Sequence, residues 1–252
     1  MNFLVLTGFL AQALTLFDGA FLSRTARVSA AAVDNPLVLQ YKFNEGSGTN
    51  IADHTGAYSA FAVGGTWVTG ASGSGNALSF NGSSDFCRSS NQVAWGTNAV
   101  SVTLWLWWDS FADDDDLAFE TGPNIQTTYP GFYLLPNCSW LTPDFLVAVR
   151  DAGGYSYRLI NRPSSGAWHH YAITVDRGSA PTSMALYLDG SLQTVTTNAN
   201  ATSQTSAIVT SHLYLMSRGG TTLFGAGRMD DFRAYSGVLS AAEVSAIYAD
   251  PQ

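Results

Sequence analysis

Residues 168–190, WHHYAITVDRGSAPTSMALYLDG, decide the fold of this chain. Two runs with strand character, His169–Val175 and Met184–Leu188, lie within this segment. The pair Asp189-Gly190 directly follows the second run, and such a pair between apolar runs favours a tight hairpin turn. The segment therefore predicts antiparallel strands that follow one another along the chain.

Runs of the same kind recur from Leu37 onward. In Leu37–Phe43 the residues alternate between two faces, as they do in a strand with one buried side. The other runs with strand character are Ala77–Phe80, Val100–Trp108, Phe132–Leu135, Phe145–Arg150, Tyr155–Ile160, Ile208–Met216 and Arg228–Tyr235. Turns rich in Gly and Asn separate them at intervals of about ten residues, which is typical of sandwiches and jelly rolls. We therefore predict an all-β fold, an antiparallel β-sandwich jelly roll over residues 36–252.

A short helix is predicted at the C-terminal end of this domain. Ser240-Ala241-Ala242-Glu243 has the form of a capping box, in which the serine and the glutamate satisfy each other's backbone N–H groups. Val244, Ile247 and Tyr248 then share one side of the helix that follows. The helix is expected to pack this side against the sandwich.

The composition excludes several classes of protein. Of the 252 residues, 46% are hydrophobic and 12% are charged, whereas a disordered chain combines low hydrophobicity with high charge. The formal net charge is −8, so the chain lacks the basic surface that binds DNA or RNA, and anionic membranes are disfavoured. We expect neither a nucleic acid nor a membrane as a partner.

The two cysteines leave two interpretations open. Cys87 and Cys138 could form one disulfide that closes a loop of about fifty residues. They could equally be two buried thiols in an apolar sandwich.

Residues 1–35 differ from the rest and are predicted to form an N-terminal docking arm. Residues 1–22 are strongly apolar, and residues 23–36 have the character of a linker. The large side chains expected to anchor the arm are Phe3, Leu6, Leu10, Phe17 and Phe21. Because so apolar a segment must be covered, we favour burial of residues 1–22 against other protein chains. An uncleaved export signal and a first strand pair of the domain are the alternatives, and the absence of Lys or Arg before the apolar run weighs against export.

Four stretches, in this order along the chain, carry a resemblance to a known family. They are Tyr41–Gly48 followed by Asp53 and Gly56, Gly75–Gly82 followed by Asp85 and Phe86, Trp168–Ala172 followed by Leu186–Gly190, and Gly227–Arg233 followed by Leu239, Ser240 and Glu243. Together they resemble the laminin-G-like jelly rolls of the concanavalin A-like lectin and glucanase superfamily. The resemblance implies the jelly-roll fold. It also implies roles seen among family members, which include glycan binding, adhesion and structural appendages of larger proteins such as virus particles.

The residues offer little for catalysis. A glucanase of this superfamily needs paired carboxylates across the scissile bond, and the E-x-D-x-x-E arrangement of its strand is absent. The three glutamates are Glu45 in a Gly-rich turn, Glu120, and Glu243 in the capping box. The adjacent His169 and His170 should point to opposite faces of a strand and cannot share a metal. We expect the chain not to be an enzyme.

Binding sites are predicted from aromatic and acidic residues. Sugar sites typically combine an aromatic platform with polar hydrogen-bonding groups, and the candidates in loop-like contexts are Trp95, Trp140, Tyr129 and Tyr155. For a metal, the resemblance implies calcium, and the candidates are Asp113 and Asp115 in the Asp113–Asp116 loop, together with Asn44, Asp53 and Asp230. The alternatives are a solvated loop for the first group and hydrogen bonds to turn backbones for the second.

The function that these observations favour is a non-catalytic surface module that binds glycans or mediates adhesion. Its arm would attach it to capsid or tail proteins or to copies of itself, at a virion surface (as a head decoration, spike or tail-fibre component) or at a cell surface outside the cell. The possible ligand is a surface polysaccharide. The alternatives are a secreted polysaccharide-active enzyme or its accessory carbohydrate-binding domain, and a structural cement protein without a ligand.

Overall fold

The computed structural model describes residues 33–251 apart from 74, 96–97, 112–114, 128–129, 140–143, 152, 180–181 and 201–207. The anchoring side chains predicted for the arm, Phe3, Leu6, Leu10, Phe17 and Phe21, lie outside the described residues. The first described strand, β1, begins at Leu37, next to the predicted start of the jelly roll.

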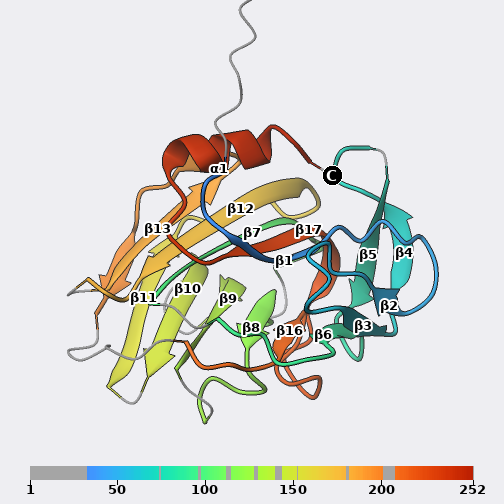
Figure 1. Cartoon of the computed structure of the whole chain (residues 1–252), viewed down its shortest axis with the longest axis horizontal. Helices are drawn as coiled ribbons and strands as arrows, with labels where there is room; N and C mark the ends of the chain where they lie inside the picture. Colours follow the sequence, from blue (N-terminus) through green and yellow to red (C-terminus); the bar gives the residue numbers. More distant parts are fainter. Residues whose placement is uncertain are drawn as a thin grey trace, which may run out of the picture. The chain divides into compact units, whose positions relative to one another are not determined.

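The described residues form two antiparallel sheets that face each other, with one helix (Figure 1). The first sheet contains, in order, β14 (Ser191–Leu192), β13 (Ser183–Leu188), β12 (Trp168–Asp176), β7 (Ala99–Trp108), β17 (Ala226–Tyr235), β5 (Asn76–Asn81) and β4 (Thr66–Thr69), with β1 (Leu37–Tyr41) also paired to β17. The second contains β15 (Thr197–Ala199), β11 (Gly154–Ile160), β10 (Asp144–Asp151), β9 (Gly131–Cys138), β8 (Phe119–Thr121), β16 (Leu213–Leu215), β6 (Phe86–Ser89), β3 (Ala60–Val63) and β2 (Asn50–Ile51). The predicted antiparallel β-sandwich is confirmed.

The main hydrophobic core fills the space between the two sheets. Aromatic rings from both sheets meet there: Phe119 of β8 lies 5.6 Å from Phe232 of β17, and Phe145 of β10 stacks on Tyr171 of β12 at 4.5 Å between ring centroids. Such pairs add directional attraction to the burial of large apolar surfaces. The core therefore ties together strands that are far apart in the sequence.

The hairpin predicted at Asp189-Gly190 is present. Both residues have positive φ, 48° and 76°, and they join β13 to β14. Asp189 also accepts a hydrogen bond from the backbone N–H of His170, 2.8 Å away. The turn is therefore held both by its own backbone conformation and by the neighbouring strand β12.

The predicted C-terminal helix is α1 (Ala241–Tyr248), and its capping box is formed as expected. Glu243 accepts hydrogen bonds from Ser240 and, on its other oxygen, from the backbone N–H of Asp34 at 3.0 Å. Burial acts to raise the pKa of Glu243, but these hydrogen bonds outweigh it and lower the pKa to about 2. The glutamate therefore fastens the start of the domain to its last helix.

In the described part of the chain, no helix is long and apolar enough to cross a membrane.

The two cysteines are buried thiols and not the halves of a disulfide. Cys87 lies in the core between the sheets, whereas Cys138 belongs to a second hydrophobic cluster. Because the two thiols belong to different clusters, the structure supports the second of the two interpretations that the sequence left open.

Candidate functional site

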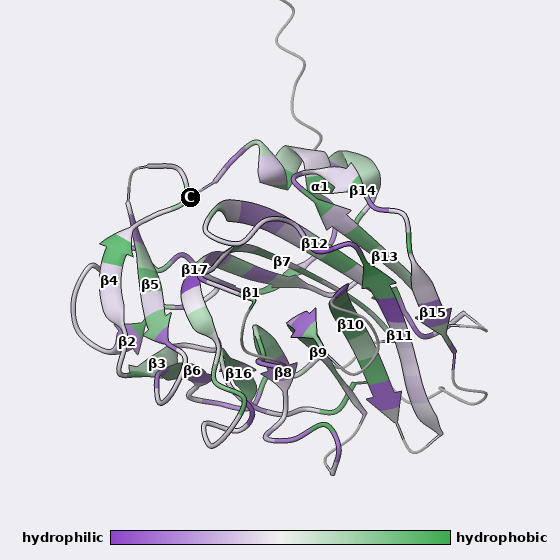
Figure 2. Ribbon diagram, turned by 180° about the vertical axis from the view of Figure 1, so that it is seen from behind, coloured by the Kyte–Doolittle hydropathy of each residue, from purple (hydrophilic) through white to green (hydrophobic). Residues whose placement is uncertain are grey.

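The second hydrophobic cluster lies on the nine-stranded sheet, apart from the core between the sheets. Its buried members are Leu117, Ile125, Tyr133, Leu135, Cys138, Leu146, Ala148 and Leu159, with Tyr155, Tyr157 and Leu223 packed against them. Along β9 these residues alternate with core residues such as Phe132 and Leu134, so the strand is buried on both faces. Figure 2 shows the hydrophobic residues that run along the neighbouring strand β10.

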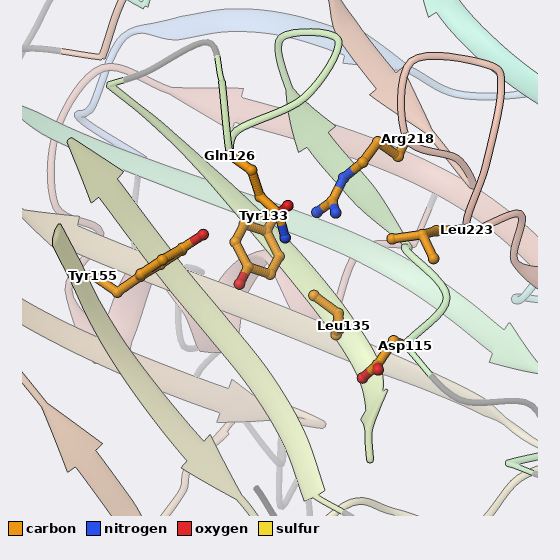
Figure 3. Close-up of a pocket in the computed structure, with 7 residues that line it drawn as sticks. All are labelled: Asp115, Gln126, Tyr133, Leu135, Tyr155, Arg218 and Leu223. Atoms are coloured by element: carbon orange, nitrogen blue, oxygen red, sulfur yellow. The ribbon is translucent and has the colours of Figure 1, made fainter. Parts of the chain in front are cut away.

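A pocket of about 460 Å³ opens over this cluster. Its lining residues are Asp115, Gln126, Tyr133, Leu135, Tyr155, Arg218 and Leu223 (Figure 3). They come from strands β9 and β11 and from the loops before β8, before β9 and after β16. A volume of several hundred Å³ with an aromatic floor and a few polar groups is typical of sites for small ligands.

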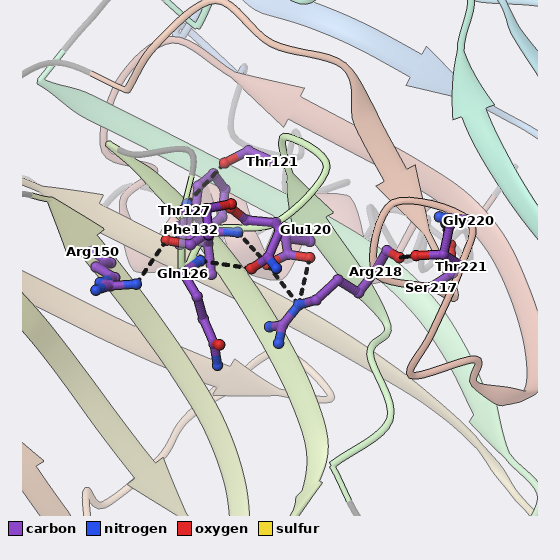
Figure 4. A network of polar contacts seen from close by, with 12 residues as sticks. Glu120, Thr121, Gln126, Thr127, Phe132, Arg150, Ser217, Arg218, Gly220 and Thr221 are labelled. Atoms are coloured by element: carbon purple, nitrogen blue, oxygen red, sulfur yellow. Dashed lines mark hydrogen bonds and ion pairs between the residues drawn. The ribbon is translucent and has the colours of Figure 1, made fainter.

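One wall of the pocket rests on a buried ion pair. Glu120 of β8 is 0% exposed, and it accepts hydrogen bonds from Nε of Arg218 at 3.1 and 3.2 Å and from the backbone N–H of Ile125 at 2.8 Å (Figure 4). Burial raises the pKa of Glu120, and the charge of Arg218 acts in the opposite direction. The pair holds the Arg218 guanidinium against the pocket.

The opposite wall is an aromatic ring backed by a second arginine. The guanidinium of Arg150 lies 4.7 Å from the ring centroid of Tyr155 and donates to the backbone oxygen of Ile125 at 3.2 Å. In Figure 3 the hydroxyl of Tyr155 points into the pocket, towards Tyr133. The cation–π contact orients the ring, so Tyr155 offers a positioned aromatic edge and a hydroxyl to a ligand.

The pocket brings together two residues that the sequence predicted for different roles. Tyr155 was a candidate platform and Asp115 a candidate metal ligand, and both line this pocket. The carboxylate of Asp115 accepts hydrogen bonds from the backbone N–H and the hydroxyl of Ser139, at 3.1 and 3.0 Å. Tyr129, Trp140 and Asp113, which were also predicted, lie outside the described residues.

The prediction for Trp95 is wrong. Its side chain is 1% exposed and packs edge-on against Phe132, 5.9 Å away between ring centroids, in the core between the sheets. No face of the ring is left for a sugar. The loop-like sequence around Trp95 suggested exposure, but the loop turns the indole inward.

The sequence missed Tyr133 and Arg218. Tyr133 lies in the apolar run Phe132–Leu135 of a strand that is buried throughout, so its place on the pocket face could not be separated from the core by periodicity. Arg218 directly precedes Gly219-Gly220, two glycines with positive φ. An arginine next to two glycines indicates a charge held in a tight turn, and this pattern could have identified Arg218 as a candidate site residue.

Among the predicted calcium ligands, Asp53 is engaged by the protein itself. Its carboxylate accepts hydrogen bonds from the backbone N–H groups of Gln40, Thr55, Ala57 and Tyr58 and from the Thr55 hydroxyl. Asn44 accepts from the backbone N–H of Asn76 at 2.8 Å. These bonds match the alternative in which the side chains hold turn backbones. Within the described ranges, no group of three or more His, Cys, Asp or Glu side chains could hold a metal ion.

Asp230 of β17 differs from Asp53, because one of its oxygens is unused. The residue is 1% exposed, its Oδ2 accepts from the backbone N–H of Ala71 at 2.9 Å, and its Oδ1 has no partner among the described residues. Burial first, and the nearby charge of Asp231 second, raise the pKa of Asp230 to about 7. A buried carboxylate oxygen without a partner fits a protonated carboxyl group better than a bare charge.

We predict that the buried carboxyl group of Asp230 makes the stability of the protein depend on pH. The raised pKa means that Asp230 is protonated in the folded protein at pH values where the unfolded chain is already ionised, so its burial costs stability as the pH rises from about 4 to 7. Asp230→Asn, which has the same shape and does not ionise, should remove this loss. The melting temperature, followed by differential scanning calorimetry, should therefore fall less over this pH range in Asp230→Asn than in the natural protein. An equal fall in both would assign the dependence to other groups.

The two adjacent histidines and the three glutamates contact other residues of the fold. His170 is buried beside Trp105 and Tyr248, and burial lowers its pKa to about 4, whereas His169 pairs with Asp189 at 2.8 Å. Glu45 accepts from the backbone N–H of Ala52 at 2.9 Å, in addition to the roles of Glu120 and Glu243 described above. Each glutamate is thus engaged in holding backbone or a buried charge.

Comparisons with known proteins agree with this fold. A laminin-G family model described as the concanavalin A-like lectin/glucanases superfamily matches residues 80–245. Domain 4 of AbnA, a GH43 extracellular arabinanase from Geobacillus stearothermophilus, solved in complex with arabinotriose, is similar in structure, with a TM-score of 0.64 and 18% identity over 86% of this chain and 99% of that one.

Two further structures match parts of larger chains. The receptor binding domain of botulinum neurotoxin type G has a TM-score of 0.59 and 14% identity over 85% of this chain and 51% of that one. Trypanosoma rangeli sialidase in complex with the inhibitor DANA has a TM-score of 0.56 and 14% identity over 84% of this chain and 32% of that one. A comparison with curated protein sequences finds no match. Since the family model covers most of the chain, from strand β5 to helix α1, this protein belongs to the concanavalin A-like lectin/glucanases superfamily.

Proposed function

We propose that this protein is a non-catalytic glycan-binding module whose ligand site is the pocket over β9 and β11. The observation that carries the proposal is the combination of groups in that pocket. Tyr133 and Tyr155 supply aromatic surface, while Asp115, Gln126 and Arg218 supply hydrogen-bond acceptors and donors. Sugars present apolar C–H faces and rings of hydroxyls, and this mixture of side chains is complementary to both.

Two findings support the proposal. The arabinanase domain that resembles this chain over nearly its whole length was solved with arabinotriose, a short sugar chain. In the present protein the glutamates are engaged in structural hydrogen bonds, and the one nearest the pocket, Glu120, is fully buried under Arg218. Glycoside hydrolysis needs a pair of carboxyl groups that reach the substrate, and Asp115 is the one carboxylate among the described residues that line the pocket. The pocket therefore favours binding over hydrolysis.

The test is a binding titration of the purified protein with a panel of neutral and acidic oligosaccharides. Tyr155→Ala should weaken binding of the recognised glycan by about tenfold or more, because an aromatic contact at the centre of a site is lost. Tyr155→Phe, which keeps the ring, is the matched control and should lose less. If no glycan in the panel binds, the proposal fails and a structural cement protein becomes the better account. Turnover of a glycan that disappears on substitution of Glu120 or Glu45 would instead favour an enzyme.

We also propose that residues 1–22 anchor the module to other protein chains, at a virion surface or at a cell surface. Phe3, Leu6, Leu10, Phe17 and Phe21 support this, since leaving such side chains in water costs roughly 1.5–3 kcal/mol each relative to burial. Changing Leu6, Leu10 and Phe17 to Asp should abolish self-association in analytical ultracentrifugation while the circular dichroism spectrum stays unchanged. Normal assembly of this variant, or a natural N-terminus near Val33, would contradict the anchor and favour an export signal.

A further inference from the structure

The pocket contains hydrogen-bond donors that no residue in the described part of the chain accepts. Arg218 gives its Nε to Glu120, and its side chain is only 12% exposed. Among the residues that the structure describes, none accepts a hydrogen bond from either terminal nitrogen of Arg218. Figure 3 shows both nitrogens on the pocket side, towards Gln126 and Tyr133. A guanidinium so nearly buried needs acceptors for these N–H groups, and since none is found among the described residues, water or a ligand in the pocket can supply them.

The guanidinium is also fixed in place before any ligand arrives. Both oxygens of Glu120 hold its Nε, and the ring of Tyr133 lies 5.9 Å from its central carbon. The backbone of Arg218 is paired with Thr222, with an N–H to oxygen distance of 2.8 Å. The two terminal nitrogens of the guanidinium form a fork of N–H groups. Because this fork is already oriented, it loses little conformational freedom on binding, and two of its N–H groups match the geometry of a carboxylate.

A second lining residue of the pocket carries the opposite charge. Asp115 is held by Ser139, and as a carboxylate it accepts hydrogen bonds but repels another carboxylate. In Figure 3, Leu135 lies between Asp115 and Arg218, and the ring of Tyr133 lies to one side, towards Tyr155. A ligand that fits both must carry an anionic group for Arg218, hydroxyls for Asp115 and an apolar face for the floor.

We propose that the pocket takes an acidic sugar, a hexuronic acid residue of a polysaccharide. This rests on the glycan-binding function proposed above and names its ligand class. The sugar carboxylate accepts hydrogen bonds from the two terminal nitrogens of Arg218, while ring hydroxyls donate to Asp115. The net charge of −8 disfavours anions at long range, but at physiological salt this repulsion is screened beyond about 8 Å. The local contact with Arg218 therefore determines whether the sugar carboxylate binds.

The experiment compares uronic acid oligomers with their methyl esters, which keep the hydroxyls and lose the charge. Isothermal titration of the full chain with oligomers of galacturonic, glucuronic and mannuronic acid should find one acid that binds about tenfold or more tightly than its ester. Arg218→Lys keeps a charge beside Glu120 but loses the fork. It should weaken binding of the acid by a similar factor and binding of the ester by a clearly smaller factor, and the circular dichroism spectrum should show that the variant is folded.

Three outcomes would overturn the inference in distinguishable ways. If an acid and its ester bind equally, or if Arg218→Lys weakens binding of both by the same factor, the pocket binds glycans but does not distinguish charged from uncharged ones. Binding of neutral oligosaccharides alone would likewise leave the glycan-binding function standing and remove the acidic ligand. If neither acidic nor neutral oligosaccharides bind, both proposals fall together.

Discussion

Glu120→Ala is expected to lower the free energy of unfolding by about 3–5 kcal/mol, since it removes one partner of a buried ion pair. The substitution leaves Arg218 without the acceptor of its Nε and the backbone N–H of Ile125 without a partner. Both groups are then desolvated with nothing to bond. Chemical denaturation of the variant, followed by tryptophan fluorescence, measures the loss.

A double variant separates this cause from a loss of packing. Replacing Glu120 by Leu and Arg218 by Met together removes both charges while keeping comparable volume, and such exchanges are often close to neutral. We expect the double variant to recover most of the stability that Glu120→Ala loses. It should nonetheless lose the binding of an acidic sugar, because the fork is gone. A double variant as unstable as the single one would show that the ion pair itself stabilises this region.

Asp53→Ala should cost a comparable amount, about 3–5 kcal/mol, because one carboxylate satisfies five donors. Four of these are backbone N–H groups between Gln40 and Tyr58, and the N–H of Gln40 is buried. A hydrogen bond to a charged group contributes about 1.5–3 kcal/mol, and the more exposed donors can turn to water, so the sum is smaller than five full contributions. The melting temperature in calorimetry should fall accordingly.

The matched control is Asp53→Asn, which has the same shape. Its amide nitrogen would face N–H donors instead of accepting from them, so this variant should lose at least half of the stability lost in Asp53→Ala. The dependence on pH gives a second test. Although burial acts to raise the pKa of Asp53, hydrogen bonds from Thr55, Gln40 and Tyr58 lower it overall. Its contribution is therefore present above the pKa of about 3.9 in the unfolded chain and is lost as the pH falls through the lower folded value. Asp53→Ala should reduce the fall in stability that the natural protein shows at acidic pH. An unchanged fall would assign this pH dependence to other carboxyl groups.

Local patterns in the sequence were enough to predict the fold class. The turn at Asp189-Gly190 and the capping box from Ser240 to Glu243 depend on residues that are adjacent or three apart, and both are present. The two adjacent histidines fall on different sides of β12, as an extended backbone requires. Such features follow from short-range sterics and hydrogen bonds, which the sequence displays directly.

The candidate site was only partly predictable. Tyr155 and Asp115 were chosen separately and for different roles, and nothing in the sequence indicated that they line one pocket. The candidate Trp95 shows the opposite error, since a loop-like segment placed its indole in the core. In both cases the outcome depends on which elements pack together, and residue spacing does not report this.

By itself, then, the sequence determined the strands, the hairpin and the capped helix, because these arise from contacts between near neighbours. The tertiary structure alone decided the order of the strands in each sheet and the two-sided burial of β9. It also decided the pairing of Glu120 with Arg218, which are 98 positions apart, and the hydrogen bond that the buried Asp230 accepts from Ala71, 159 positions away. The physical reason is that burial and charge pairing depend on distance in space, and a chain folded into two sheets brings distant segments into contact.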